Sequence, residues 1–464
     1  MYALGNVHVD GVAVPAQKDC VDNSDNCVGR RVAVTAVVTV LLPDRRVRST
    51  VPTDLTPVDE SLADALSAER ERQRETLTLI ASENHASEAV LRAQGSVLTN
   101  NYAEGRPGDR YYAGCAHADE VERLAIERAR ELFDTVHANV QPHSGTQANL
   151  AAYEALLEPG DSILSLELTS GGHLSHGHDA TAVATHYEVE HYHVDPETGR
   201  LDYEAVAERA RETNPDLLVS GYSAYPRRVD WERMQAIAES VDAAHVADIA
   251  HLTGLVAADI YPSPVGVADV VTCSTHKTIR SGRGGAIMAS EEYAEAVDRA
   301  VFPGCQGGPL LHNVAGKAAG FYEALQPEFE AYASQTVENA TALGERLDGR
   351  GFDLVSGGTD VHFVLLDFQQ SHPDLTGQRA EELLEAVGVV CNKSTVPGDR
   401  RNSTVTSGVR LGTPAITTRG FDADATRRLA DAIADVLDSP EDESVRADAS
   451  GTVADLCTEF PVYE

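Results

Sequence analysis

One of the four lysines in this chain stands where a buried strand is expected to end. The run Val270–Ser274 is apolar and closes in small hydroxyl residues, and Lys277 follows it, ahead of the glycine-rich stretch 282–285. Open α/β sheets place their ligands at the carboxyl edge of the strands. A lysine that is desolvated there loses proton affinity and can form a Schiff base with an aldehyde. A surface lysine after a strand is the alternative, but lysine is scarce in this sequence.

Two further segments complement this lysine. Asp248 ends another apolar run, and a buried carboxylate is costly unless it pairs with a cation, for which a protonated pyridine nitrogen is suitable. The hydroxyl and glycine residues of 144–146 precede a helical pattern and would form an anion cradle at a helix N-terminus. Taken alone, each segment also fits an ordinary helix cap. Together with Lys277, they indicate a pyridoxal phosphate site.

The elements that must position these residues alternate along the chain. Short apolar runs bounded by polar, glycine or proline residues predict strands at Ser162–Leu166, Leu217–Ser220, Ala244–Asp248, Val270–Ser274 and Ala286–Ala289. Helical patterns at 202–213 and 230–242 lie between some of them, and residues 58–79 are charged and helix-prone. Strands that alternate with helices predict an α/β fold with a mostly parallel, buried sheet.

The chain divides into five segments by pattern. We expect an atypical N-terminal extension at 1–50, an N-terminal helical arm at 51–100, a cofactor-binding large domain at 101–326, a smaller α+β domain at 327–438, and a polar, loosely held tail at 439–464. In the extension, Arg30 and Arg31 precede an apolar run as in a twin-arginine export signal, but no cleavage site follows. A β-hairpin, or an extension upstream of the true start, is the favoured interpretation. Cys20 and Cys27 either pair, bind a metal or stay free, and we expect no metal site.

Composition excludes several classes of protein. The chain has 37 Lys+Arg against 73 Asp+Glu and a formal net charge of −36, so its surface would repel nucleic acid. No apolar run approaches the ~20 residues that span a membrane. A strongly acidic, lysine-poor surface is typical of cells with molar internal salt, although an ordinary acidic cytoplasmic enzyme is the alternative. Seven scattered cysteines favour a reducing compartment, and hence a cytoplasmic location.

A series of motifs in order makes residues 55–438 similar to serine hydroxymethyltransferase. They are Leu79–Asn84, Leu98–Gly105, Arg110–Tyr112, His143–Asn149, Gly171–Leu174, Ala247–His251, Val270–Thr278, Phe302–Gly304, Gln306–Pro309 and Thr406–Ala415. The resemblance implies a pyridoxal-phosphate-dependent transferase of fold type I, like aspartate aminotransferase. That fold has a large domain with a mostly parallel sheet and a smaller α+β C-terminal domain.

The resemblance also implies a set of site residues. It implies catalytic roles for Lys277, Glu104, Asp248, His173 and Tyr112. It implies cofactor contacts from Lys277, Ser144, Gly145, Thr146, His173, Ser223, Asp248, His251 and His276, and from Tyr102 and Gly308 of a neighbouring chain. It implies substrate contacts from Ser82, Glu104, Tyr112 and Arg410, and folate contacts from Leu168, Gly172, His173, Leu174 and Ser394. Read without the resemblance, His173 is a structural histidine, Arg410 a surface arginine, and the tyrosines core aromatics.

The activity so implied is the reversible conversion of serine and tetrahydrofolate to glycine and 5,10-methylenetetrahydrofolate through a cofactor aldimine, in a homodimer or a dimer of dimers. The sequence departs from the family pattern at 281–282 and in two places associated with the folate ring, 393–397 and 402–404. The alternative is therefore a folate-independent aldolase for β-hydroxy amino acids or a hydroxymethyltransferase for α-methylserine. A non-catalytic binding protein on this scaffold would lack Lys277 or Asp248, and both are present.

Overall fold

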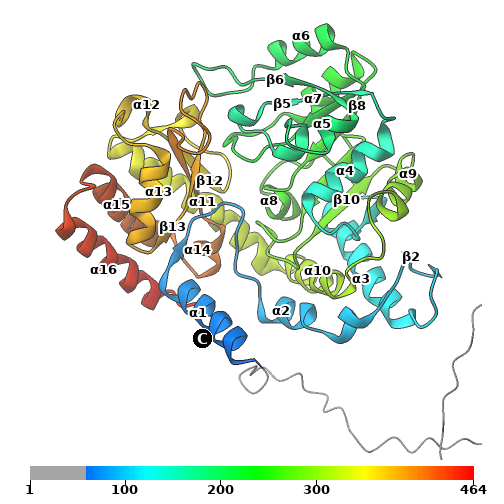
Figure 1. The fold of residues 1–464 in the computed structure, drawn as a ribbon, viewed down its shortest axis with the longest axis horizontal. Helices are drawn as coiled ribbons and strands as arrows, with labels where there is room; N and C mark the ends of the chain where they lie inside the picture. Colours follow the sequence, from blue (N-terminus) through cyan, green and yellow to red (C-terminus); the bar gives the residue numbers. More distant parts are fainter. Residues whose placement is uncertain (1–58, 464) are drawn as a thin grey trace, which may run out of the picture.

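A computed structural model of the 464-residue chain describes residues 59–463 (Figure 1). Two α/β units pack side by side, a large unit built on a seven-stranded sheet and a smaller unit built on a four-stranded sheet. The predictions for the extension 1–50, including the export signal and the state of Cys20 and Cys27, lie outside the described residues.

The large unit is built on one mixed sheet. Its strands are β4 (His137–Asn139), β5 (Ser162–Leu166), β6 (Glu188–Tyr192), β7 (Leu217–Ser220), β8 (Ala244–Asp248), β9 (Val270–Ser274) and β10 (Gly285–Ala289). They lie in the order β4-β10-β9-β8-β7-β5-β6. Neighbours from β6 to β9 are parallel, whereas β10 runs antiparallel to both β4 and β9. The predicted mostly parallel sheet is confirmed, and β5, β7, β8 and β9 have the predicted bounds.

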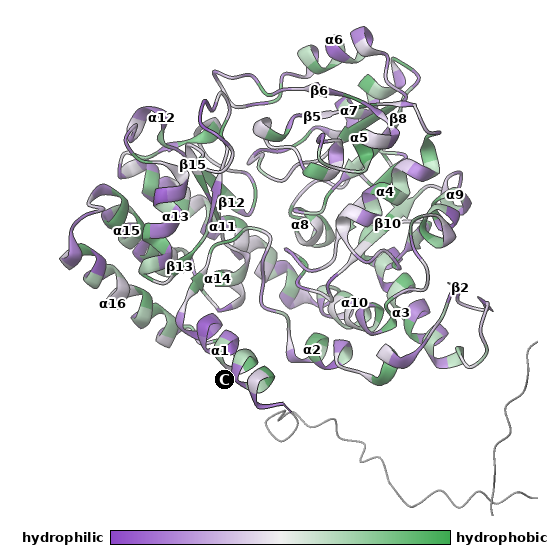
Figure 2. Ribbon diagram, in the orientation of Figure 1, coloured by the Kyte–Doolittle hydropathy of each residue, from purple (hydrophilic) through white to green (hydrophobic). Residues whose placement is uncertain are grey.

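Both faces of this sheet are buried, because successive residues of one strand enter different cores. Val270 lies in one core and Val271 in the other, and Leu217 and Leu218 divide in the same way. Strands buried on both faces must be apolar throughout, which explains the unbroken apolar runs of the sequence. In Figure 2 the central strands are mostly hydrophobic, whereas the peripheral helices carry more hydrophilic residues.

Helices cover the two faces. They are α3 (Ala116–Phe133), α4 (Gly145–Leu156), α6 (Tyr203–Thr213), α7 (Trp231–Glu239), α8 (Thr253–Ala257), α9 (Ala294–Arg299) and α10 (Leu311–Ala324). Shorter elements of this unit are α5 (Val183–His186) and the two-residue strands β2 (Gly105–Arg106) and β3 (Asp109–Arg110), which pair with each other. The buried apolar residues of α4 and α9 join one core, and most of those of α3, α6, α7 and α10 join the other.

The smaller unit is an antiparallel sheet covered by long helices, as expected for an α+β domain. Its strands are β11 (Asp353–Leu354), β12 (Phe363–Asp367), β14 (Asn392–Ser394) and β15 (Gly408–Gly412), in the order β11-β12-β15-β14. Its helices are α11 (Pro327–Gly349), α12 (Phe368–Ser371), α13 (Gly377–Ala386), α14 (Pro414–Thr418) and α15 (Ala423–Asp438).

The N-terminal arm joins both units. After α1 (Glu60–Glu75), the strand β1 (Leu77–Thr78) pairs in parallel with β13 (Val389–Val390) of the smaller unit. The next helix, α2 (Glu88–Gln94), packs instead against α10 of the large unit. The helix expected over 58–79 therefore ends at Glu75, because Leu77 and Leu79 are buried in the core of the smaller unit.

The expectation of a loosely held tail is wrong. Residues Glu443–Glu459 form helix α16, which packs along α15 (Figure 1). Ala449, Val453 and Leu456 are buried at spacings of four and three residues, which is the period of one helical face. The polar residues between them hid this apolar stripe in the composition.

None of the helices within 59–463 is both long and apolar enough to cross a membrane.

The packing of α16 gives a prediction for the stability of the smaller unit. Leu456→Ala should lower the free energy of unfolding by about 2–5 kcal/mol, because Leu456 is fully buried and its removal leaves a cavity. Chemical denaturation in molar potassium chloride measures the change. Asp455→Ala, an exposed neighbour on the same helix, is the matched control and should change the stability by less than about 0.5 kcal/mol. Equal stability of the two variants would contradict the packing.

Candidate active site

A cavity of about 200 Å³ lies at the carboxyl ends of β8 and β9, beside the N-terminus of α4. All nine residues expected to hold the cofactor within one chain line it: Ser144, Gly145, Thr146, His173, Ser223, Asp248, His251, His276 and Lys277. The sequence analysis did not assign a role to the other lining residues, Asn149, Tyr222, Ala250, Ser274 and Arg283. The cavity thus gathers segments that are far apart in the sequence.

Lys277 enters the cavity from the turn after β9. The turn is fixed by its backbone, since Asn84 donates its side-chain amide to the carbonyl of Lys277 at 3.0 Å and Thr275 donates to the carbonyl of Gly282 at 2.5 Å. The side chain is buried, with 9% of the residue exposed. Burial lowers the pKa of Lys277 to about 8, although the nearby carboxylate of Asp248 opposes this shift. A fraction of the amine is therefore neutral, and nucleophilic, near neutral pH.

Asp248, the last residue of β8, is a buried carboxylate with three donors. Asn149 and His176 donate to its Oδ2 at 2.8 and 2.9 Å, and the N–H of Ala250 donates to its Oδ1 at 2.8 Å. Burial alone would raise the pKa of Asp248, but the hydrogen bond and charge of His176 and the bond from Asn149 hold it below its ordinary value. Thr272 of β9 donates to Asn149 Oδ1 at 2.5 Å, which turns the amide N–H₂ of Asn149 towards Asp248.

These partners of Asp248 were missed by the sequence analysis. Asn149 lies one helical turn after Gly145, so its spacing placed it on the face of α4 that looks into the site. His176 belongs to a histidine-rich run with His173 and His178, which was the available signal. Neither signal distinguishes a ligand-orienting residue from an ordinary one without the fold.

The N-terminus of α4 can hold an anion. Ser144 caps the helix, because its Oγ accepts the N–H of Gln147 at 3.1 Å and its carbonyl accepts that of Ala148 at 3.0 Å. The N–H groups of Gly145 and Thr146 stand at the cavity wall without an acceptor from residues 59–463. A Cβ at Gly145 would lie 2.5 Å from Ser274 Oγ, so only glycine fits this close approach. The helix dipole and these N–H groups together favour a phosphate.

The donor set fits pyridoxal phosphate. An ionised carboxylate stands at one part of the cavity, free N–H groups at another, and a lysine with a lowered pKa lines the same space. These are the groups that a pyridine nitrogen, a phosphate and an aldehyde require.

The histidines of the site are held in their neutral forms. Burial lowers the pKa of His173 to about 4, and the N–H of Ser175 donates to its Nδ1, so the ring proton is left on Nε2. Burial also lowers the pKa of His251 well below its ordinary value, and its ring stacks on His362 with a centroid distance of 5.5 Å. A neutral, flat ring such as His173 can pack on an aromatic cofactor without a charge penalty.

Arg410 extends from β15 of the smaller unit to the wall of this site. Its Nη1 donates to the carbonyl of Ser223 at 2.7 Å, and its Nε and Nη2 donate to Asn392 Oδ1 at 3.3 and 3.2 Å. Burial lowers the pKa of Arg410 to about 10. No carboxylate within 59–463 forms an ion pair with it, so a planar guanidinium is held ready for an anionic group.

Four of the predicted residues form a separate group outside this cavity. Tyr102, Glu104, Tyr112 and Gly308 lie together elsewhere: Tyr112 donates its hydroxyl to Glu104 at 3.3 Å, and its ring meets that of Tyr102 edge-on at 5.3 Å. A Cβ at Gly308 would lie 3.5 Å from Glu104 Cγ. Tyr102 is 63% exposed and Tyr112 45% exposed. Their roles at the cofactor and the substrate therefore stay predictions.

The other residues predicted to contact the substrate or the folate lie in three different places. Ser82 lines an adjoining cavity of about 370 Å³, which shares His276 and Arg283 with the first. Leu168, Gly172 and Leu174 flank His173 in the turns after β5, and Leu174 is exposed. Ser394 lies in β14, where its hydroxyl donates to the carbonyl of Thr395 at 3.2 Å. None of these five residues lines the cofactor cavity, so the substrate contact of Ser82 and the folate contacts of the other four stay predictions.

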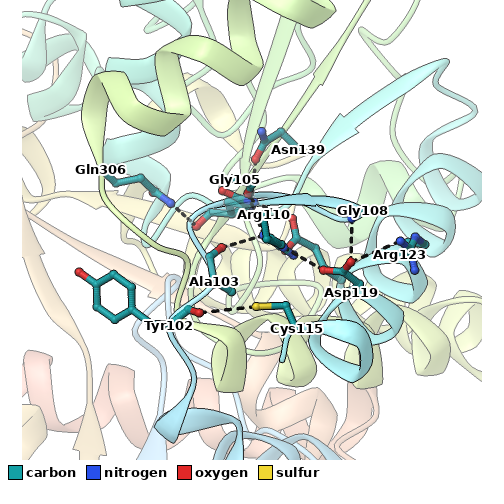
Figure 3. A network of polar contacts seen from close by, with 12 residues as sticks. Tyr102, Ala103, Gly105, Gly108, Arg110, Cys115, Asp119, Arg123, Asn139 and Gln306 are labelled. Carbon is teal, nitrogen blue, oxygen red and sulfur yellow. Dashed lines mark hydrogen bonds and ion pairs between the residues drawn. The ribbon is translucent and has the colours of Figure 1, made fainter. Parts of the chain in front are cut away.

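A buried arginine fixes the loop that carries Glu104 (Figure 3). Arg110 Nη1 donates to the carbonyls of Ala103 and Gly105, the residues on either side of Glu104, at 2.8 and 2.7 Å. The same guanidinium donates to Asp119 and Glu122 of α3 at 2.9 and 2.6 Å. The backbone on either side of Glu104 is thus tied to a long helix, whereas its carboxylate is bonded only by the hydroxyl of Tyr112 among residues 59–463.

The lowered pKa of Lys277 gives a prediction for cofactor attachment. The rate at which the cofactor-free chain reacts with pyridoxal phosphate should rise with pH and level off near pH 8, because only the neutral amine attacks the aldehyde. Stopped-flow absorbance measures the rate, and a lysine peptide with an ordinary pKa near ~10.4 corrects for titration of the cofactor. A rate that keeps rising tenfold per pH unit beyond pH 9 would contradict the lowered pKa.

The comparisons with known proteins agree with this geometry. The family model for serine hydroxymethyltransferase matches residues 55–433. A relative of that name from Natronomonas pharaonis is 64% identical over 406 residues, which cover 88% of this chain and 96% of the relative. Another from Halobacterium salinarum is 63% identical over 407 residues, covering 88% and 98%. A third from Alkalilimnicola ehrlichii is 52% identical over 408 residues, covering 88% and 97%.

The first two of these relatives come from halophilic archaea, in agreement with the acidic, lysine-poor composition of this chain. The match covers both structural units and includes the lysine, aspartate and helix N-terminus of the cavity. The chain therefore belongs to the serine hydroxymethyltransferase family, a family of pyridoxal-phosphate-dependent transferases of fold type I.

Proposed function

We propose that this chain catalyses the reversible conversion of serine and tetrahydrofolate to glycine and 5,10-methylenetetrahydrofolate. The observation that carries the proposal is the convergence of the Lys277 amine, the Asp248 carboxylate and the N-terminus of α4 on one cavity. The relatives that share 64% and 63% of their residues with this chain bear the name of that activity.

Each part of the cavity has a task in this reaction. Pyridoxal phosphate, when bound, supplies an electron sink for bond breaking at the α-carbon of the amino acid. Lys277 anchors the cofactor through its amine, and Asp248 keeps a proton on the pyridine nitrogen because its own pKa is low. The N–H groups at the start of α4 bind the phosphate.

The substrate is oriented by groups outside the cofactor cradle. Arg410 binds the substrate carboxylate with the guanidinium donors that its protein partners leave free. Glu104 of a neighbouring chain moves the proton at the hydroxymethyl group, and the Arg110 network holds its backbone in place for that transfer.

The function is tested by serine turnover with and without tetrahydrofolate in molar potassium chloride. We expect glycine formation to depend on the folate, and Lys277→Ala to lower the rate by about 10³-fold or more because no other amine anchors the cofactor. Arg346→Ala, which removes an exposed ion pair with Asp431, is the control and should keep wild-type turnover. Turnover that is equally fast without folate would instead establish the folate-independent aldolase.

We also propose that the active form is at least a dimer. The support is an exposed group of large apolar side chains on and around α2, α3 and α10, which a solitary chain would leave in water: Leu91, Val97, Tyr102, Tyr111, Tyr112, Leu124, Leu310 and Tyr322. Glu104 belongs to the same region. In a twofold dimer, each chain can then lend Glu104 to the cavity of its partner.

Mixed dimers test this exchange of residues. Co-expressed Glu104→Gln and Lys277→Ala chains, each inactive alone, should recover about a quarter of wild-type activity, since half of the dimers are mixed and one of their two sites is intact. The matched control pairs Asp248→Asn with Lys277→Ala. Because those two residues act within one chain, this pair should recover nothing. Mixed dimers that form without regaining activity in the first pair would contradict the shared site.

A cytoplasmic location is the last part of the proposal. Cys115, Cys273, Cys305, Cys391 and Cys457 are all free, as expected in a reducing compartment.

A further inference from the structure

A second buried lysine lies close to the cofactor cradle, and the reaction as proposed does not use it. Lys317 is on α10, and only 1% of it is exposed. It forms no ion pair with a carboxylate within residues 59–463. A buried ammonium without a counter-ion is costly unless its hydrogens are all bonded.

Three backbone carbonyls satisfy this ammonium. Nζ of Lys317 donates to the carbonyl oxygens of Val140, Pro142 and Gly285 at 2.7, 2.9 and 2.9 Å. Burial lowers the pKa of Lys317 to about 7, while the three acceptors favour the protonated form, since a neutral amine has only two hydrogens to donate. Because three N–H hydrogens meet three acceptors, the site suits the protonated form of Lys317.

The three carbonyls belong to the segments that enclose the phosphate cradle. Val140 and Pro142 lie in the short connection from β4 to the helix cap Ser144, and Gly285 begins β10 after the Lys277 turn. The N–H of Gly285 also donates to the carbonyl of Pro142 at 3.0 Å. Through these hydrogen bonds, Lys317 holds the connection that leads into α4 against the loop that follows Lys277.

The surrounding glycines show how closely α10 approaches this loop. A Cβ at Gly284 would lie 2.4 Å from Lys317 Cε and 2.6 Å from Nζ, and a Cβ at Gly282 would lie 2.6 Å from the backbone N of Lys317. Ser281 donates its hydroxyl to the carbonyl of Lys317 at 3.2 Å. Burial is the main cause that lowers the pKa of His143 and of His276; the charge of Lys317 adds to it at His143 and, after the charges of Arg283 and Lys277, at His276.

We propose that Lys317 is a positioning residue for the cofactor phosphate: its ammonium holds the carbonyls of Val140, Pro142 and Gly285, and thereby sets the free N–H groups at the start of α4. This inference rests on the cofactor-binding part of the proposed function. It assigns to Lys317 no contact with the cofactor and no proton transfer.

The test compares pyridoxal phosphate with pyridoxal, which lacks the phosphate. Dissociation constants of the full-length chain for both compounds are measured by equilibrium dialysis in molar potassium chloride. Lys317→Met should weaken the binding of pyridoxal phosphate by about 10- to 100-fold and the binding of pyridoxal by less than about threefold, because only the phosphate site loses its geometry. Inorganic phosphate should raise the melting temperature of the wild type and not that of the variant.

Lys393→Met removes a half-buried lysine paired with Glu381 and is the matched control, expected to leave both constants unchanged. If Lys317→Met does not fold, Gly284→Ala takes its place, since its Cβ displaces the ammonium without removing it. Equal weakening of both compounds, or no weakening of either, would overturn the positioning role. Failure of the wild type to bind pyridoxal phosphate would instead refute the proposed function itself.

Discussion

The site depends on a carboxylate that stays ionised inside the protein. Asp248 is buried, and its charge is maintained by donors from α4, from the turn after β5 and from the backbone N–H of Ala250. Its charge in turn limits how far burial lowers the pKa of Lys277. Because β8 and β9 are parallel neighbours with Asp248 opposite Thr272, the two strands deliver the acid and the amine to the same edge of the sheet. The register of one strand pair thus sets the chemistry of the cavity.

The same dependence explains what the sequence could and could not predict. Strands such as β8 and β9 were predicted to the residue, since strands buried on both faces are unbroken apolar runs that polar residues delimit. Asp248 and Lys277 stand out because charged residues at the ends of such runs are unusual. Asn149 and His176 do not, because their importance lies in a contact with Asp248 across the fold.

Lys317 shows most clearly what could not be predicted from the sequence. Its three partners are backbone carbonyls, which every residue carries, so no side-chain pattern could reveal them. Helix α16 escaped notice for a different reason, since its apolar stripe is narrow and the segment as a whole is polar. Glu104 was placed by resemblance, and it does not line the cavity of its own chain.

The excess of arginine over lysine in the chain is reflected in its ion pairs. Between α11 and α15, Arg346 and Arg350 bind three aspartates, and Arg350 alone reaches Asp431, Asp435 and Asp438. At molar salt the screening length falls to about 3 Å, so only ion pairs in direct contact persist. A forked guanidinium can contact several carboxylates at once, whereas an ammonium is a single point charge. An arginine-rich, lysine-poor surface follows from that geometry.

The path of the N-terminal arm has a mechanical consequence. Within residues 59–463 the chain passes between the two units twice, once between β1 and α2 and once along α11, which is buried in the core of the large unit at Phe329 and in that of the smaller unit at Leu343. A relative movement of the units would therefore have to be absorbed at these two places. Asn84 lies in the first crossing and bonds to Lys277 of the large unit, to Tyr332 of α11 and to Thr418 of α14. The first of these places lies beside Lys277, so a movement there would also shift Arg410 of the smaller unit relative to the cavity.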